Sequence, residues 1–270
     1  MRRLMLASLS AAMLLTPAIA TAQTVGINAA IRNKVLTRPN AQAALQPAVL
    51  RARVGLGEQV ITAPASMLQI VLLDRSNFTV GANARVTIDR FVYDPSRSAS
   101  AIGASVAKGA FRFISGRSVH NMPGKTAITT PVASIGVRGT IFEGVVGEEA
   151  VRIASGEQDV GGRAGTSSVE SATLVVLRGP AATATEPGGA IDVSANGRTV
   201  AVDKPGLAVF IPGPGQDAIG PFPLSDKGML ALADLLRTSP DKRDGRDAIE
   251  PYSNPIIDQT LETIQVQRGN

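Results

Sequence analysis

An alternation of apolar and polar residues between Gly109 and Gly144 constrains the fold of this 270-residue chain more than any other feature. At its start, Phe111 and Phe113 fall on one face of an extended segment, and Arg112 falls on the opposite face. Successive side chains of a β-strand point to opposite faces, so this spacing predicts a strand with one apolar face.

The same period continues further along this stretch, between residues 133 and 141. The apolar face is formed by Ala133, Ile135, Val137 and Ile141, and the polar face by Ser134, Arg138 and Thr140. Gly136 and Gly139 interrupt the run, which indicates a bend, a bulge or a close approach of two backbones. We therefore expect one strand over residues 133–146, bent or bulged at the two glycines.

Turn signals recur about every 8–12 residues along most of the chain, a pattern typical of all-β proteins. The predicted strands span residues 25–35, 49–54, 59–62, 68–73, 78–80, 85–93, 105–114, 125–130, 133–146, 151–154, 169–177, 191–194, 199–202 and 207–211. Asn196-Gly197 predicts a two-residue hairpin, since both positions tolerate a positive φ. Ser225 is a suitable N-cap for a short amphipathic helix that continues through Leu236.

These elements predict a mainly β fold, with antiparallel strands in a twisted β-roll, solenoid or sandwich and one short C-terminal helix. The triplet Gly-Glu-Gln occurs at residues 57–59 and again at 156–158. It suggests stacked β-units, or a coincidence in a glycine-rich chain. The expected organisation is 1–22 signal peptide, 23–146 first β domain, 147–215 continuing β region, 216–237 helix and 238–270 flexible tail.

The N-terminus has the features of a secretory signal peptide. Arg2 and Arg3 precede an apolar run over residues 4–15, and small residues allow cleavage after Ala20 or Ala22. The alternative is a membrane anchor, although the run is short for one, and no other segment has the length to span a bilayer. We expect a periplasmic or secreted bacterial protein without a stable membrane anchor after cleavage.

Composition excludes several functional classes. The chain has no cysteine, so disulfides and thiolate catalysis are excluded. The formal net charge is +5, from 27 basic and 22 acidic residues. Without Arg2 and Arg3, 25 basic residues face 22 acidic ones, and the remaining +3 predicts no nucleic-acid partner.

Two motifs resemble the FecR domain family. The stretch Gly-Ala-Phe-Arg-Phe-Ile-Ser-Gly from Gly109 and the stretch Thr-Pro-Val-Ala-Ser-Ile-Gly-Val-Arg-Gly-Thr-Ile-Phe from Thr130 are similar to its two hallmark strands. Residues 56–62 and 70–81 are similar to its opening and core strands, so the resemblance is good over 25–143 and weaker to 212. Where the family often has a glycine after the core aspartate, this chain has Arg75, which leaves the turn type open.

The resemblance implies a non-enzymatic periplasmic binding module. Proteins of the family regulate iron uptake by joining an anti-sigma domain, a membrane helix and the FecR domain. We expect neither of the first two here, so the binding module alone carries over, with an envelope protein as partner and a possible part in signalling. Recognition would use strand pairing or a face of the roll. The alternative is a structural or surface scaffold of the cell envelope.

Few residues carry recognisable chemistry. His120 is the only histidine, and no nucleophile elbow, phosphate loop or metal-binding spacing is present, so we expect no catalytic site, cofactor or metal. An enzyme acting on envelope polysaccharide is the disfavoured third alternative. The candidate partner-binding residues are Arg112, Arg138, Gly136, Gly139 and Thr140. Both arginines could meet one acid, Glu143 or Asp89, as a structural ion pair, or they could receive a partner's carboxylate.

Overall fold

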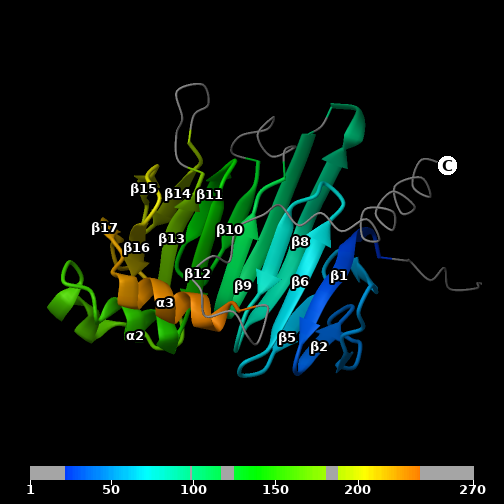
Figure 1. Ribbon diagram of the computed structural model, residues 1–270, viewed down its shortest axis with the longest axis horizontal. Coiled ribbons are helices and arrows are strands. Elements are labelled where there is room, and N and C mark those ends of the chain that lie inside the picture. The colour runs from blue at the N-terminus through cyan, green and yellow to red at the C-terminus, as the bar shows by residue number, and fades with distance from the viewer. Residues whose placement is uncertain (1–21, 98, 117–124, 181–187, 238–270) are drawn as a thin grey trace, which may run out of the picture.

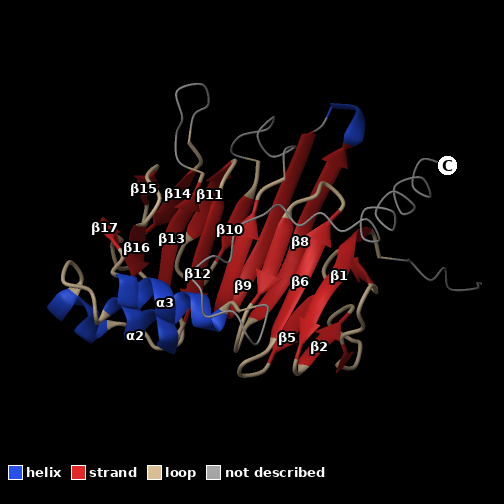
Figure 2. Ribbon diagram, viewed as in Figure 1, coloured by secondary structure: helices blue, strands red, loops and turns tan. Residues whose placement is uncertain are grey.

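The computed structural model describes residues 22–237, apart from 98, 117–124 and 181–187. These residues form two stacked β-sheets, with short helices against the outer face of one of them (Figures 1 and 2). The mainly β, largely antiparallel fold with a short C-terminal helix is confirmed.

The first sheet, sheet A, carries the helices on its outer face. Its strands, in spatial order, are β4 (Arg53–Gly55), β1 (Thr24–Arg32), β6 (Met67–Leu72), β7 (Asn77–Val80), the second part of β9 (Ala99–Ile114), β12 (Ile141–Val146), β13 (Thr173–Gly179), β16 (Leu207–Ile211) and β17 (Ile219–Pro223). All of these pairs are antiparallel.

The second sheet, sheet B, lies behind sheet A in Figure 1. Its strands, in spatial order, are β3 (Gln46–Pro47), β2 (Val35–Arg38), β5 (Gln59–Thr62), β8 (Arg85–Asp94), the first part of β9, β10 (Ala127–Thr129), β11 (Ser134–Arg138), β14 (Ala190–Ala195) and β15 (Arg198–Val202). Its pairs are antiparallel except for β9 with β10.

Strand β9 belongs to both sheets. Up to Lys108 it pairs with β8 in sheet B, and from Gly109 it pairs with β12 in sheet A. At Gly109 the backbone has φ +82°, and a Cβ there would lie 2.3 Å from Cα of Ala84. Only glycine fits this crossing point, because a side chain would be strained by φ and would collide with backbone.

The main core fills the space between the two sheets. At its centre are the buried rings of Phe78, Phe111, Phe113 and Phe142, from β7, β9 and β12. Their neighbouring centroids are 5.9 to 6.2 Å apart, a range in which aromatic pairs attract one another. The prediction that Phe111 and Phe113 lie on the apolar face of a strand is confirmed.

The outer face of sheet A has a second, smaller core under helices α2 (Glu148–Ala154) and α3 (Asp226–Leu235) and the 3₁₀ helix η2 (Gly161–Thr166). A second 3₁₀ helix, η1 (Pro95–Arg97), follows β8. The predicted N-cap is confirmed, since the Ser225 hydroxyl accepts a hydrogen bond from the Gly228 N–H at 3.1 Å. No helix in the described part of the chain has the length and hydrophobicity needed to cross a membrane.

Two of the predicted elements are wrong, and one strand was missed. The run 133–146 is two strands in different sheets, because the chain turns at Gly139, where φ is +53°, and passes from β11 to β12. Residues 151–154 are helical, with Glu148 and Glu149 in the first turn, where carboxylates favour a helix. Strand β17 was not predicted, since its prolines disfavour a strand assignment.

Of the two interpretations of the Gly-Glu-Gln triplets, coincidence is the one that fits the structure. Gly57 lies in the turn between β4 and β5, whereas Gly156 follows helix α2. The two Gly-Glu-Gln triplets therefore do not mark equivalent β-units. The hairpin at Asn196-Gly197 is confirmed, with φ of +48° and +75° at its two residues.

Candidate functional site

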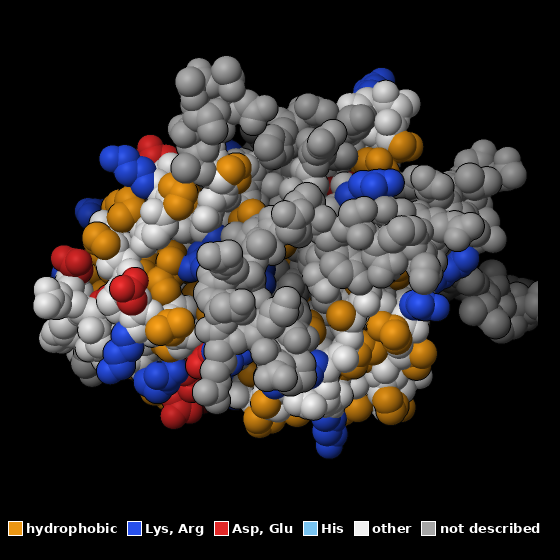
Figure 3. All heavy atoms as spheres, viewed as in Figure 1, with side chains coloured by type: hydrophobic (Ala, Val, Ile, Leu, Met, Phe, Trp, Pro, Cys, Tyr) orange, Lys and Arg blue, Asp and Glu red, His pale blue; other side chains and the backbone are white. Residues whose placement is uncertain are grey.

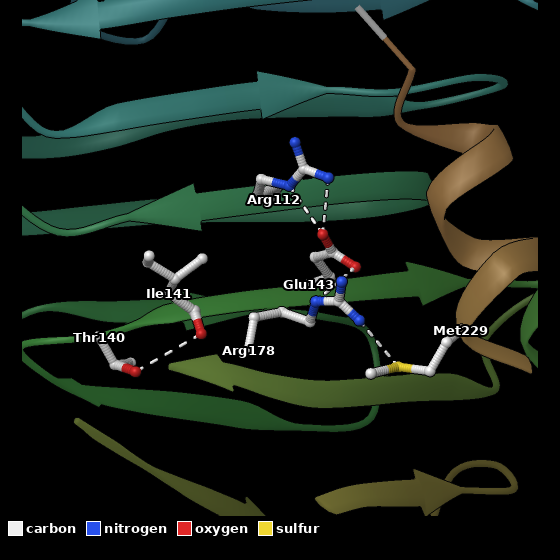
Figure 4. Close-up of polar contacts among 6 residues, drawn as sticks. All are labelled: Arg112, Thr140, Ile141, Glu143, Arg178 and Met229. Carbon is white, nitrogen blue, oxygen red and sulfur yellow. Dashed lines mark hydrogen bonds and ion pairs between the residues drawn. The ribbon is translucent and has the colours of Figure 1, made fainter. Parts of the chain in front are cut away.

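Arg112 forms an ion pair on the outer face of sheet A. Residue 112 on β9 lies directly opposite Glu143 on β12, and its Nε and Nη2 lie 2.8 and 2.7 Å from Oε1 of that carboxylate (Figure 4). The Glu143 side chain is only 1% exposed. One of the two predicted acidic partners is thus the actual partner of Arg112.

A second arginine completes this ion cluster. Nε of Arg178, on β13, lies 3.6 Å from Oε2 of Glu143, and its Nη1 donates to the sulfur of Met229 in α3 at 2.9 Å (Figure 4). The cluster therefore joins β9, β12, β13 and α3. This buried carboxylate forms its ion pairs with two guanidinium groups of the fold, while its Oε2 has no hydrogen-bond partner among the described residues. The geometry fits the structural interpretation of Arg112.

Arg138 lies elsewhere, so the expectation that both arginines meet one acid is wrong. It belongs to β11 in sheet B, and its Nη2 lies 3.1 Å from Oδ1 of Asp192 on β14, with both side chains largely exposed. Asp89, the other suggested acid, accepts a hydrogen bond from Ser105. The two arginines point from different sheets, because the chain crosses between sheets after residue 138.

Gly139 and Thr140 form the crossing from β11 to β12. The Thr140 hydroxyl donates to the carbonyl of Gly179 at 2.5 Å, and its own carbonyl accepts from the backbone and side chain of Ser115. Gly136 lies in regular pairing, where an added Cβ would have only ordinary contacts, 3.7 Å from Asp192. These residues hold the two sheets together, and Ile141 is only partly buried instead of sharing the inner face.

Sequence reasoning missed a buried acid in the turn between β6 and β7. Asp74 is 2% exposed, and its carboxylate accepts hydrogen bonds from the backbone and hydroxyl of Ser76 at 3.0 and 2.9 Å. Burial raises the pKa of the Asp74 carboxyl, although the neighbouring Ser100 and Ser76 oppose this rise. Arg75 takes the position that glycine often has in the family, with φ +66°. The sequence Asp74-Arg75-Ser76 was the signal that could have revealed this turn and its buried acid.

Within the described residues, no three side chains among His, Cys, Asp and Glu come together as metal ligands could. His120 lies outside the described residues. The predicted motif therefore supplies structural contacts, and a binding surface has to be sought elsewhere on the sandwich.

The four edges of the two sheets differ in their ability to pair with another strand. In sheet A, β4 has three residues, and β17 contains Pro221 and Pro223. In sheet B, β3 consists of Gln46 and Pro47, whereas β15 has five residues and no proline. Short strands and prolines protect edges from strand addition, so β15 is the edge that is open to it.

The backbone of β15 presents unpaired groups along its outer side. A two-residue turn makes Ala195 and Arg198 a hydrogen-bonded pair, so the N–H and C=O groups of Thr199 and Ala201 point away from β14. Neither residue has another backbone partner within the described ranges. Both are exposed. Strand β15 therefore offers two donors and two acceptors to an extended chain.

Comparison with known families identifies the region that contains the motif. Residues 58–160 match the family model described as FecR protein. This confirms the resemblance over a stretch shorter than the motifs suggested. The matched residues include β5, the crossing strand β9, the Arg112–Glu143 pair and α2, whereas β15 lies outside them.

Among solved structures, the chain is similar to two crystal structures, at 2.50 and 1.65 Å resolution, of a candidate anti-sigma factor from Parabacteroides distasonis ATCC 8503. The identity is 12% for both, with TM-scores of 0.38 and 0.37. The similarity covers 59% of this chain and 57% of theirs, so the chain spans little more than half the length of those proteins. No curated protein matches the chain.

Proposed function

With a FecR region at residues 58–160, we propose that this protein is an exported, non-enzymatic module that binds a protein of the cell envelope by strand addition at β15. The family match fits a part in signalling. The signal-peptide pattern of residues 1–22 supports export.

The open edge of β15 is the observation that carries this proposal. Thr199 and Ala201 direct their backbone N–H and C=O groups outward, and the other three sheet edges are short or contain proline. An extended segment of a partner can pair with such an edge through main-chain hydrogen bonds, and pockets for alternate side chains then determine specificity.

Charges beside the edge define which segment fits. Arg198 begins β15, and its Nη1 lies 3.2 Å from Oδ2 of Asp217, with side chains 75% and 49% exposed. Oδ1 of the same aspartate accepts from Nδ2 of Asn196 at 2.7 Å. An exposed ion pair is easily rearranged, because its net strength is small. Arg198 is therefore able to turn to an acidic side chain of the partner strand.

A non-enzymatic role agrees with the placement of the polar groups. The buried acids Glu143 and Asp74 are engaged by Arg112 and Ser76 instead of lining a cleft. Catalytic carboxylates need access to a substrate. The polar groups that sequence analysis singled out thus serve the sandwich itself.

Site-specific photo-crosslinking in intact cells tests this function. A photoreactive amino acid at Thr199, an exposed residue of β15, is expected to give an adduct with one envelope protein, identified by mass spectrometry. Ala201→Pro removes an outward N–H and is expected to abolish the adduct. Ala201→Ser at the same position keeps that N–H and serves as the matched control.

The outcomes separate the proposed functions. Equal adducts in the proline and serine variants would contradict strand addition at this edge. Adducts formed only between copies of this chain would favour the scaffold alternative, since strand edges also mediate self-association.

A further inference from the structure

The same three-residue pattern recurs at one level across five neighbouring strands of sheet B. Each strand presents a small residue, an apolar residue and a hydroxyl residue in succession, apart from Asp192 at one of the small positions. The triplets are Gly103-Ala104-Ser105 in β9, Ala127-Ile128-Thr129 in β10, Ser134-Ile135-Gly136 in β11, Asp192-Val193-Ser194 in β14 and Thr199-Val200-Ala201 in β15. The order is reversed in β11 and β15, which run opposite to the other three strands, so residues of the same kind lie directly opposite one another.

The hydroxyl residues form a row on the outer face of sheet B that ends at Thr199. Oγ of Ser105 lies 3.0 Å from Oγ1 of Thr129, and Oγ of Ser194 lies 2.8 Å from Oγ1 of Thr199. Cross-strand pairs of Ser and Thr stabilise a sheet. A hydroxyl has one donor and two acceptor sites, so Thr199 can also bond a hydroxyl on the side away from β14. The row therefore favours Ser or Thr at the next position.

The middle residues of the triplets face the main core. In β9, β10, β11 and β14 they are at most 1% exposed, whereas Val200 in β15 packs against the same core and is only partly buried. Leu207 and Ala218 are also partly buried against this core, and hydrophobic side chains are visible at the surface near β15, β16 and β17 in Figure 3. An aliphatic residue placed beside Val200 by an added strand would remove apolar surface from water, which favours binding.

The small residues form a second row on the outer face, which ends at Ala201. The one larger member, Asp192, has its carboxylate 3.1 Å from Nη2 of Arg138 on β11. Ala201 presents only a methyl group to the next strand. A large side chain opposite it would gain little packing, since cross-strand pairs stabilise a sheet through contact between their side chains. A small residue is therefore sufficient at this position.

We propose that the segment added to β15 runs antiparallel to it and carries a small residue, a branched aliphatic residue and Ser or Thr, in that order, as in Ala-Val-Thr. This inference rests on the strand addition proposed above and specifies its partner. The outward N–H and C=O groups of Thr199 and Ala201 form two hydrogen-bonded pairs with such a segment. The pairs place the hydroxyl residue opposite Thr199, the aliphatic residue opposite Val200 and the small residue opposite Ala201.

A second copy of β15 fits this edge less well. Read in chain direction, residues 199–201 are Thr-Val-Ala, the reverse of the proposed order. Two copies that paired antiparallel through these residues would place Thr199 of each opposite Ala201 of the other. Both the row of hydroxyls and the row of small residues would be broken at the junction. The edge therefore favours a segment of another protein.

Capped peptides test the proposed order of residues by NMR titration of the ¹⁵N-labelled full-length protein. The first carries Ala-Val-Thr between glycine pairs, the second Ala-Thr-Thr and the third the reversed order Thr-Val-Ala. The first is expected to shift the amides of Thr199 and Ala201. We expect it to bind about tenfold more tightly than the second, which lacks the aliphatic residue, and about two- to fivefold more tightly than the third, which misplaces the hydroxyl. Equal affinity of the first peptide and either of the others would overturn the proposed segment.

Methylated peptides test the strand addition separately. Methylation of the Ala and Thr nitrogens of the first peptide removes the two N–H groups directed at β15 and is expected to abolish binding. Methylation of the Val nitrogen, which points away from β15, is the matched control and is expected to retain binding. Equal binding by the two methylated peptides would refute strand addition at this edge. Failure of every peptide to bind would count against both the strand addition and the proposed segment.

A variant of the protein locates the aliphatic contact. Val200→Thr keeps the shape of the side chain and is expected to reduce the preference for Ala-Val-Thr over Ala-Thr-Thr from about tenfold to about threefold or less. Val92→Thr, at a residue of β8 that is 59% exposed, is the control and is expected to leave the preference unchanged. A preference that survives unchanged in Val200→Thr would refute the contact with Val200 and, with it, the proposed segment.

Discussion

Nη2 of Arg112 lies 2.7 Å from Oε1 of Glu143, and the glutamate is almost completely buried under the outer face of sheet A. The pair lies opposite one another on β9 and β12, and Arg178 approaches the other carboxylate oxygen. A carboxylate in this position keeps two positive charges close together in a place where water does little to screen them.

Glu143→Gln is expected to destabilise the fold strongly. The substitution leaves two guanidinium groups without a buried counter-charge, and breaking a buried ion pair costs about 3–5 kcal/mol. Since the arginines retain some exposure, we expect a loss of about 2–4 kcal/mol in the free energy of unfolding, measured by urea denaturation. Arg138→Lys is the control, because its exposed pair with Asp192 contributes at most about 1 kcal/mol. A larger effect at residue 138 than at 143 would contradict the structural assignment.

Gly109→Ala is expected to disrupt the crossing of β9 between the sheets. The added Cβ would have to fit at φ +82° and within 2.4 Å of the Asn83 carbonyl oxygen. The unfavourable φ costs about 1–2 kcal/mol, and the collision with backbone adds to it. Gly57→Ala has a similar φ of +80° with open space around its Cβ, so it reports the cost of φ alone. Thermal denaturation of both variants separates the cost of the unfavourable φ from the cost of the collision with backbone. Equal melting temperatures would argue against a close approach of the Asn83–Ala84 backbone to Gly109.

Asp74 is expected to make stability depend on pH. Burial raises the pKa of its carboxyl in the folded protein above the ordinary value of about 3.9, so the folded state favours the protonated form. The stabilisation is fully present below the unfolded-state pKa, and it is lost as the pH rises through the folded-state pKa. Asp74→Asn keeps an acceptor for the Ser76 N–H and removes the titration. The free energy of unfolding of the wild type, relative to this variant, should therefore fall as the pH rises from about 4. A difference in the free energy of unfolding that stays constant with pH would contradict this role of Asp74.

The N-terminus of the exported protein is expected to be Thr21 or Gln23. These residues follow the two possible cleavage positions after Ala20 and Ala22. Intact-mass spectrometry of protein from the periplasmic fraction distinguishes them. Replacing Ala20 and Ala22 with Leu should block cleavage and retain the protein in the membrane fraction. Recovery of the full-length chain from the wild type would favour the membrane-anchor alternative.

The fold class and most strands could be predicted from sequence because burial on one face imposes a period of two. Strand β5 agrees to the residue, and Phe111 and Phe113 face the core as expected. The period does not reveal which sheet a strand joins. The turn at Gly139 depends on the φ angle of one residue, yet it places Arg138 and Glu143 in different sheets. The alternation of apolar and polar side chains does not predict such a turn.

The candidate binding surface was less predictable than the fold. Strand pairing was anticipated as a mode of recognition, but the open edge is a property of sheet order, since no later strand in the described part of the chain pairs with β15. The motif residues lie within the matched FecR region, and both motif arginines, Arg112 and Arg138, pair with acids of this chain.

The passage of β9 from sheet B into sheet A has a mechanical consequence. Because one uninterrupted strand carries hydrogen bonds in both layers, the layers are joined by the backbone at Gly109 as well as by their shared core. We therefore expect tension applied between the β4 end and the β15 end of the sandwich to load both layers together.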